Sequence, residues 1–229
     1  MSPVPAPGAP IPLKGLRGSI ARNVSAGWLA PQVAMGIDVE MTRCLALAEE
    51  RQKAGNGQRV TMTAVILRAL ALALRAHPRL NASITEAGVE LAGSVNLGLA
   101  VALEDGLMVP VIRNADAKSI EELAAESRDF ADGARRGRLP PKAYQGGSFT
   151  LSNLGPAGID WFTPILNPPQ VAILGIGRVA ERVVYRAGAI RAVPMMTAVV
   201  VFDHRAVDGD PAARFLKHLC DRLESADGL

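Results

Sequence analysis

Aromatic residues, cysteines and histidines are scarce in this chain. Phe, Trp and Tyr make up 4% of its 229 residues, and it has two cysteines and three histidines. So few rings argue against a stacking platform for single-stranded nucleic acid, and a scattered net charge of +3 argues against a basic nucleic-acid arm. Cys44 and Cys220 lie in helix-like segments and form no disulfide framework, which favours a reducing compartment. The histidines show no ligand spacing with one another or with the cysteines, so we predict no metal site.

Long apolar runs are also lacking. No stretch reaches the roughly 18 uncharged residues of a membrane span, and the nearest, 62–76, is interrupted by Arg68 and Arg75. Residues 1–10 lack the apolar core of a signal peptide, and their Pro/Ala composition predicts a linker remnant. A hydrophobic content of 49% is ample for a core, and we predict one domain over 11–229. We expect neither a membrane nor nucleic acid among its partners.

Helix and strand signals are mixed along the chain without a regular βαβ rhythm. This mixture predicts an α/β sandwich with a mixed sheet rather than a doubly wound parallel sheet. Helices are predicted at 17–29, 41–54 (ending at the glycine-containing stretch 55–57), 61–77, 119–136 (opened by a capping box, a serine at 119 with a glutamate at 122) and 211–225. Strands are predicted at 32–40, 80–91 (a pair turning at 86–88), 95–103 and 107–112 (a hairpin around 104–106), 146–153, 171–177, 179–185, 190–193 and 199–202.

An apolar β-branched run, 199–202, leads directly to Asp203 and His204. We expect the strand to break there into a tight turn, because Asp208-Gly209 is a turn signal. Asp210 then reads as an N-cap, with Pro211 at the first helical position. These residues by themselves leave open a histidine that merely ends a strand.

His204 is nevertheless the candidate general base among the three histidines. An imidazole with an unperturbed pKa of about 6.5 can accept a proton near neutrality. His77 precedes a proline at a helix end and His218 lies on the polar side of the last helix, so we interpret both as structural or solvated.

Two glycine-containing segments are candidate binding sites. Ser152-Asn153 ends a predicted strand shortly before Gly155, and a simple Ser/Asn turn would explain that pattern. Gly175-Ile176-Gly177 lacks the third glycine and the following helix of a dinucleotide loop, so we expect no pyrophosphate site there.

Together these segments resemble the dihydrolipoamide acyltransferase component of 2-oxo acid dehydrogenase complexes. DHRAVDG (203–209) is similar to the family's DHRxxDG signature, whose HxxxDG part is shared with chloramphenicol acetyltransferase. SFTLSNLG (148–155), FTPILNPPQ (162–170) and GLMVPVIRN (106–114) resemble further family motifs, and the likeness covers essentially residues 11–225. It implies a chloramphenicol-acetyltransferase-like two-layer sandwich with a mixed β-sheet.

The resemblance implies transfer of an acyl group between the dihydrolipoyl thiol of a carrier domain and coenzyme A. His204 would be the base, and Ser152 would donate a hydrogen bond to the oxyanion of the tetrahedral intermediate. Asp208 matches the family's acid, and we assign it to holding the turn and its neighbouring arginines rather than to proton transfer. Alternatives are a non-catalytic core scaffold and an acetyltransferase acting on a small hydroxylated acceptor.

Coenzyme A contacts of the family are only partly matched. Asn153 and Gly177 match, Ser152 would share in the site, and Thr61 replaces a serine. Two positions depart from the family pattern: Ala48 stands in place of a helix arginine, with Arg51 one turn later, and Ala102-Leu103 stands in place of an aspartate-containing segment.

The resemblance also implies partners. The family forms homotrimers in which His204 and Ser152 would come from different chains, and the trimers build cubic or icosahedral cores. The expected partners are a lipoyl domain and the decarboxylase and dihydrolipoamide dehydrogenase components, in the cytoplasm or, in a eukaryote, the mitochondrial matrix. The chain contains no recognisable lipoyl or subunit-binding domain, so we expect either an excised core or a protein served by a separate carrier.

Overall fold

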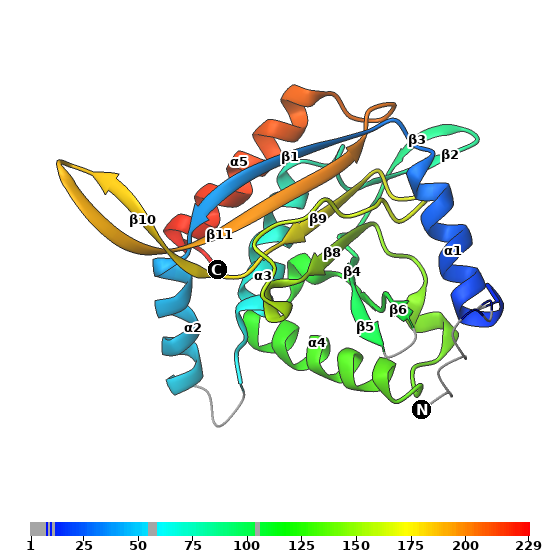
Figure 1. Ribbon diagram of the computed structural model, residues 1–229, viewed down its shortest axis with the longest axis horizontal. Coiled ribbons are helices and arrows are strands. Elements are labelled where there is room, and N and C mark those ends of the chain that lie inside the picture. Colours follow the sequence, from blue (N-terminus) through cyan, green and yellow to red (C-terminus); the bar gives the residue numbers. More distant parts are fainter. Residues whose placement is uncertain (1–7, 9, 11, 55–58, 104–105) are drawn as a thin grey trace.

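The computed structural model describes residues 8, 10, 12–54, 59–103 and 106–229 (Figure 1). Most of the predicted linker, the stretch 55–57 and residues 104–105 of the predicted hairpin turn lie outside these residues. The described chain forms one main sheet with helices packed on it. The assignment of 1–10 as a linker and 11–229 as a domain therefore stays a prediction.

Helices and strands follow one another largely as predicted. The α-helices are α1 (Gly15–Trp28), α2 (Thr42–Ala54), α3 (Met62–Ala76), α4 (Ile120–Arg135) and α5 (Gly209–Ser225). Short 3-10 turns lie at Ala115–Ala117, Pro141–Tyr144 and Gly155–Ala157. The strands are β1 (Gln32–Glu40), β2 (Ala82–Thr85), β3 (Gly88–Leu91), β4 (Leu97–Leu99), β5 (Val101–Leu103), β6 (Gly106–Met108), β7 (Val111–Ile112), β8 (Phe149–Asn153), β9 (Ala172–Ile176), β10 (Ala180–Arg186) and β11 (Ala189–Asp203).

The main sheet is mixed, as predicted. Its strands lie in the order β1-β11-β9-β8-β4-β7, and β10 pairs with β11 to form a hairpin that extends away from the body in Figure 1. β9, β8 and β4 are parallel to one another, whereas β1, β10 and β9 pair with β11 antiparallel. The hairpins β2–β3 and β5–β6 form two small separate sheets. The predicted α/β class with a mixed sheet is confirmed.

The two faces of the main sheet have different neighbours because side chains alternate along a strand. One face carries Leu151, Leu174 and Val200, which lie in the large core with the helices. The other carries Ile173, Val199 and Val201, which pack against Leu166 and Ala30 in a smaller cluster. This second face is the one on which α1 lies.

Two helices begin at a side-chain N-cap, and that of α4 was predicted. Ser119 caps α4 in a full capping box, because its hydroxyl accepts a hydrogen bond from the Glu122 amide and the Glu122 carboxylate accepts one from the Ser119 amide. Thr61 is the N-cap of α3, where its hydroxyl accepts a hydrogen bond from the Ala64 amide at 3.3 Å.

Several predicted boundaries differ in the structure. The strands predicted at 190–193 and 199–202 are one strand, β11, and the carbonyl of Pro194 within it accepts a hydrogen bond from the Met41 amide. The apolar runs 95–103 and 107–112 each divide into two short strands, so that β4 and β7 join the main sheet and β5–β6 forms a separate hairpin. α5 begins at Gly209 with Asp208 as its N-cap residue, not Asp210. Pro211 still lies in the first turn, where an amide has no intrahelical partner to lose.

Candidate functional site

His204 lies where β11 breaks into a turn, as the sequence predicts. Its amide donates to the Pro31 carbonyl at 2.9 Å, which ties the turn to the segment before β1. Its ring lies against Phe202, with the centroids 5.9 Å apart, and its side chain is 47% exposed. The imidazole is therefore carried by a rigid strand end and is open to a reactant.

Asp203, immediately before His204, is a functional candidate that the sequence analysis missed. Its side chain is 5% exposed and forms a forked ion pair with Arg205, with Nη2 of Arg205 2.6 Å from the carboxylate. Its position at the end of an apolar strand, beside a histidine and an arginine, was the available signal. Asp203 closes the turn that carries His204.

Asp208 lies near His204 but holds no arginine among the described residues. Its Oδ1 lies 3.8 Å from Nδ1 of His204, which is too long for a hydrogen bond, and its side chain is 76% exposed. The arginines of this region pair with other carboxylates: Arg205 with Asp203, and Arg214 with Asp210. The predicted arginine-holding role of Asp208 is wrong for the single subunit, and Asp203 takes that role instead.

Ser152 lies on β8, on the sheet face that α1 covers. It pairs in register with Gly175 of β9 and lines a cavity of about 290 Å³ together with Thr150, Phe162 and Pro164. Pro164 and Phe162 lie so close to Gly175 that a Cβ there would be 2.9 and 3.1 Å from them. The hydroxyl of Ser152 therefore faces a mainly apolar cavity beside a sheet position that has no room for a side chain.

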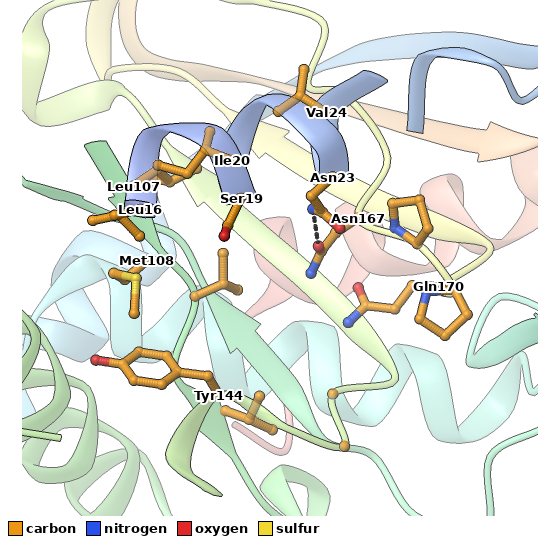
Figure 2. A pocket seen from close by; sticks show the side chains of 16 residues that line it. Leu16, Ser19, Ile20, Asn23, Val24, Leu107, Met108, Tyr144, Asn167 and Gln170 are labelled. Carbon is orange, nitrogen blue, oxygen red and sulfur yellow. Dashed lines mark hydrogen bonds between the residues drawn. The ribbon is translucent and has the colours of Figure 1, made fainter. Parts of the chain in front are cut away.

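A second cavity of about 360 Å³ shares Asn23, Val24, Leu107, Val109 and Asn167 with the first. Figure 2 shows the polar side chains that lie along it. Its described lining residues carry no charged side chain. The two cavities thus form a groove between α1 and the sheet, with largely apolar walls.

A hydrogen-bonded chain of side chains runs through this groove. Asn23 Nδ2 donates to Asn167 Oδ1 at 2.9 Å, Asn167 Nδ2 donates to Thr150 at 3.3 Å, and the Thr150 hydroxyl donates to Gln170 Oε1 at 2.6 Å. Thr150 and Gln170 are buried. The network connects α1 to the strand that carries Ser152, and the sequence analysis did not identify it.

The other predicted coenzyme A contacts gather at the N-terminus of α3. Asn153 Nδ2 donates to the Thr63 hydroxyl at 3.1 Å, two residues after the N-cap Thr61. Asn153 Oδ1 accepts from the Gly155 amide at 2.8 Å, and a Cβ at Gly155 would lie 2.7 Å from the Gly177 carbonyl. The structure thus brings Thr61, Asn153 and Gly177 to one region, on the opposite sheet face from Ser152.

The two positions that depart from the family pattern lie in different environments. Ala48 packs against the core, and Ala102 is an exposed residue of β5. Arg51 is engaged within the subunit, where it pairs with Glu121 at 3.4 Å and donates to the Leu229 carbonyl at 3.3 Å. Arg51 therefore does not replace the missing helix arginine as a free cation.

His204 and Ser152 lie far apart within one subunit. Ser152 is in register with Gly175, and Gly175 with Val199, so two strand spacings separate Ser152 from β11. His204 lies five residues beyond Val199, about 16 Å along the strand, which places the two residues roughly 19 Å apart. A single subunit does not bring the two groups together.

The remaining histidines form a structural pair. Nε2 of His77 lies 3.0 Å from Nδ1 of His218, and Arg222 donates to Nε2 of His218 at 3.0 Å. Because arginine is only a donor, neutral His218 must present its Nδ1 proton to His77. Burial, together with the neighbouring His218, lowers the pKa of His77.

Two further expectations concern absent features. Within the described ranges, no group of three or more His, Cys, Asp or Glu side chains is placed to hold a metal ion. No helix in the described part of the chain combines the length and apolarity needed to cross a membrane.

Comparison with known proteins places these features in a family. Residues 6–229 match the model for the 2-oxoacid dehydrogenases acyltransferase (catalytic domain). The chain is 39% identical over 212 residues to the dihydrolipoyllysine-residue acetyltransferase component of the pyruvate dehydrogenase complex of Bacillus subtilis, covering 90% of this chain and 48% of that protein. It is 40% identical over 227 residues to the corresponding component of the acetoin cleaving system of the same organism, covering 96% of this chain and 56% of that protein. The chain thus spans about half the length of the curated relatives it matches.

Solved structures show the same similarity over the whole fold. The dihydrolipoamide acetyltransferase of Azotobacter vinelandii superposes with a TM-score of 0.91 at 34% identity, covering 99% of this chain and 98% of that one. The cubic core of a pyruvate dehydrogenase multienzyme complex gives the same values. Chloramphenicol acetyltransferase, 18% identical with a TM-score of 0.55 over 88% of this chain and 94% of that one, shares the fold. The chain belongs to the family of 2-oxoacid dehydrogenase acyltransferase catalytic domains.

Proposed function

We propose that this chain transfers an acyl group between the dihydrolipoyl thiol of a carrier domain and coenzyme A, in the core of a 2-oxo acid dehydrogenase complex. The observation that carries the proposal is the placement of His204, a half-exposed imidazole fixed at the end of β11. Family membership supports the same reaction.

His204 acts as the base in this mechanism. A thiol with a pKa of about 8.5 is only a few per cent ionised near pH 7, so His204 takes the proton as the sulfur attacks the thioester carbonyl. The tetrahedral intermediate then expels the other sulfur as a thiolate, which receives the proton back from His204. General base catalysis of this kind contributes about 10²–10⁴ in rate.

Ser152 stabilises the oxyanion of that intermediate by donating a hydrogen bond. The Azotobacter vinelandii structure was determined to define the role of a serine, a histidine and an asparagine in its catalytic mechanism, and in that chain the histidine lies 52 positions after the serine and the asparagine four positions after the histidine. Ser152, His204 and Asp208 have the same spacing of 52 and four here. Asp208 stands at the asparagine's position, with its Oδ1 3.8 Å from Nδ1 of His204.

The two substrates reach the site from different surfaces. Coenzyme A is held near the N-terminus of α3, by Thr61, Asn153 and Gly177. Ser152 completes that site from the other face of the sheet. The uncharged groove between α1 and the sheet suits the neutral dihydrolipoyl arm better than a phosphate-bearing nucleotide, because desolvating an unpaired phosphate is costly.

Assembly completes the site. Because His204 and Ser152 are separated within one subunit, they meet across a boundary between subunits of a homotrimer, which in turn builds a cubic or icosahedral core. The lipoyl domain and the decarboxylase and dihydrolipoamide dehydrogenase components are its partners. The two buried free cysteines suit the reducing cytoplasm as the location.

The test is the variant His204→Ala, assayed with dihydrolipoamide and a panel of acetyl-, succinyl- and isobutyryl-CoA. We expect kcat to fall by about 10²–10⁴ while the mass of the assembly and its melting temperature stay unchanged. Retained transfer in this variant would refute the role of His204. A wild-type chain that assembles but transfers nothing would indicate a scaffold, and transfer to alcohols in place of dihydrolipoamide would indicate a hydroxylated acceptor.

A further inference from the structure

We propose that Asp203 is a positioning residue that fixes the turn presenting His204; this inference rests on the proposed function, since it takes His204 to be the base. Asp203 is the last residue of β11, and its amide donates to the Val171 carbonyl at 2.8 Å. The residue is 3% exposed, so its carboxylate is held inside the protein while the neighbouring imidazole lies at the surface.

The Asp203 carboxylate closes the turn through its side chain. Oδ1 accepts hydrogen bonds from the amide and from Nε of Arg205, both at 3.0 Å. Oδ2 accepts from Nε at 3.2 Å and from Nη2 at 2.6 Å. This forked pairing fixes the orientation of the Arg205 guanidinium as well as its distance from the carboxylate, so the Arg205 side chain is turned back toward Asp203.

The backbone of Asp203 closes the same turn a second time. Its carbonyl accepts hydrogen bonds from the amides of Ala206 and Val207 at 3.0 and 3.1 Å. Asp203 therefore binds the amides of three successive residues after His204. No other residue of the turn makes as many of these contacts among the described hydrogen bonds.

The His204 ring has little support of its own. Among the described residues no side chain lies within hydrogen-bond distance of it: Asp208 is 3.8 Å from Nδ1, and Phe202 supplies only a ring contact. The direction of the imidazole therefore follows from the backbone at His204, and Asp203 holds that backbone. A misplacement of about 1 Å in a reacting group can cost about 100-fold in rate.

The experiment combines Asp203→Asn with His204→Ala in a double-mutant cycle. Asp203→Asn keeps the shape of the side chain but removes its charge, and we expect kcat to fall about 10- to 100-fold while the KM values for acetyl-CoA and dihydrolipoamide change little. In the His204→Ala background the same substitution should cause no further loss, because there is no base left to position. The matched control is Asp210→Asn, which should leave kcat unchanged. It breaks an exposed ion pair between Asp210 and Arg214, two residues one helical turn apart on α5.

Two outcomes would overturn the inference: unchanged kcat in a folded Asp203→Asn variant, or an equal further loss in the His204→Ala background. If Asp203→Asn fails to assemble, Arg205→Lys tests the inference instead. The Arg205 side chain is 58% exposed, and lysine keeps the positive charge but cannot form the forked hydrogen bonds to the Asp203 carboxylate. We expect a smaller loss of kcat from Arg205→Lys, and wild-type kcat would refute the positioning role. Full activity of His204→Ala would instead refute the proposed function, so the two failures are distinguishable.

Discussion

Two inactive variants of this chain should restore activity when they assemble together. His204→Ala subunits lack the base but keep the hydroxyl of Ser152, and Ser152→Ala subunits lack the hydroxyl but keep the base. The register of β8, β9 and β11 places the two residues roughly 19 Å apart in one subunit. A thioester carbon and its oxyanion cannot span that distance, so a site that uses both groups, as proposed, must take each from a different subunit.

The size of the recovery follows from the arrangement of the sites. In the proposed ring of three identical subunits, each boundary would use the base of one subunit and the hydroxyl of the next. With random assembly of an equal mixture, half of the base-donating subunits carry His204 and half of their neighbours carry Ser152. About a quarter of all sites are then complete, so we expect about a quarter of wild-type activity.

The assay is coexpression or joint refolding of the two variants, followed by initial-rate measurement with acetyl-CoA and dihydrolipoamide and by native mass measurement. Each variant alone should retain about 1% of wild-type activity or less, so a recovery to a quarter stands out clearly. As a control, His204→Ala mixed with the His204→Ala, Ser152→Ala double variant should gain nothing. Mixed assemblies no more active than the separate variants would refute the shared site.

Two further predictions concern single positions. Ser152→Ala should lower kcat by about 10²–10³ without lowering the melting temperature, because no described group hydrogen-bonds its hydroxyl. The control Ser148→Ala should lower the melting temperature and leave kcat unchanged, since it removes the partner of the partly buried Asn96 amide, at about 1–3 kcal/mol of stability. A Ser152→Ala variant with wild-type kcat would remove the hydroxyl from the mechanism. Burial and the neighbouring His218 lower the pKa of His77 in the folded protein below its usual 6.5. The unfolded chain therefore binds more protons as the pH falls below 6.5, so the free energy of unfolding should decrease until the pH has passed the lowered pKa. Melting temperatures between pH 7.5 and 5.5 should therefore fall more steeply for wild type than for His77→Gln, and equal slopes would contradict this origin.

The sequence predicted those parts of the fold that depend on local signals. The capping box at Ser119, the strand 32–40 and the break at His204 each follow from residues within a few positions of one another, and each is confirmed. The boundaries that failed depend on tertiary pairing. The segments 190–193 and 199–202 form one strand only because β10, β1 and β9 pair along its length.

The parts of the site that were missed depend on contacts distant in sequence. Asn23 and Asn167 are 144 positions apart, and nothing local to either residue indicates their hydrogen bond. Asp203 was missed for a different reason. Its pairing with Arg205 spans only two residues, but a carboxylate beside an arginine is usually a solvated pair, and only its burial shows that it organises the turn.

The separation of His204 from Ser152 links stability, assembly and chemistry in this fold. Each group is held by a strand of the same sheet, so neither can move toward the other without disrupting pairing that many backbone hydrogen bonds maintain. Under the proposed mechanism the sheet therefore presents the base at one place and the oxyanion donor at another, and a neighbouring subunit must supply the missing half. A subunit that leaves such an assembly would lose its site even where it keeps its fold. Conditions that shift the association equilibrium would then control the number of active sites, whereas conditions that alter the turn at Asp203 would control the rate at each site.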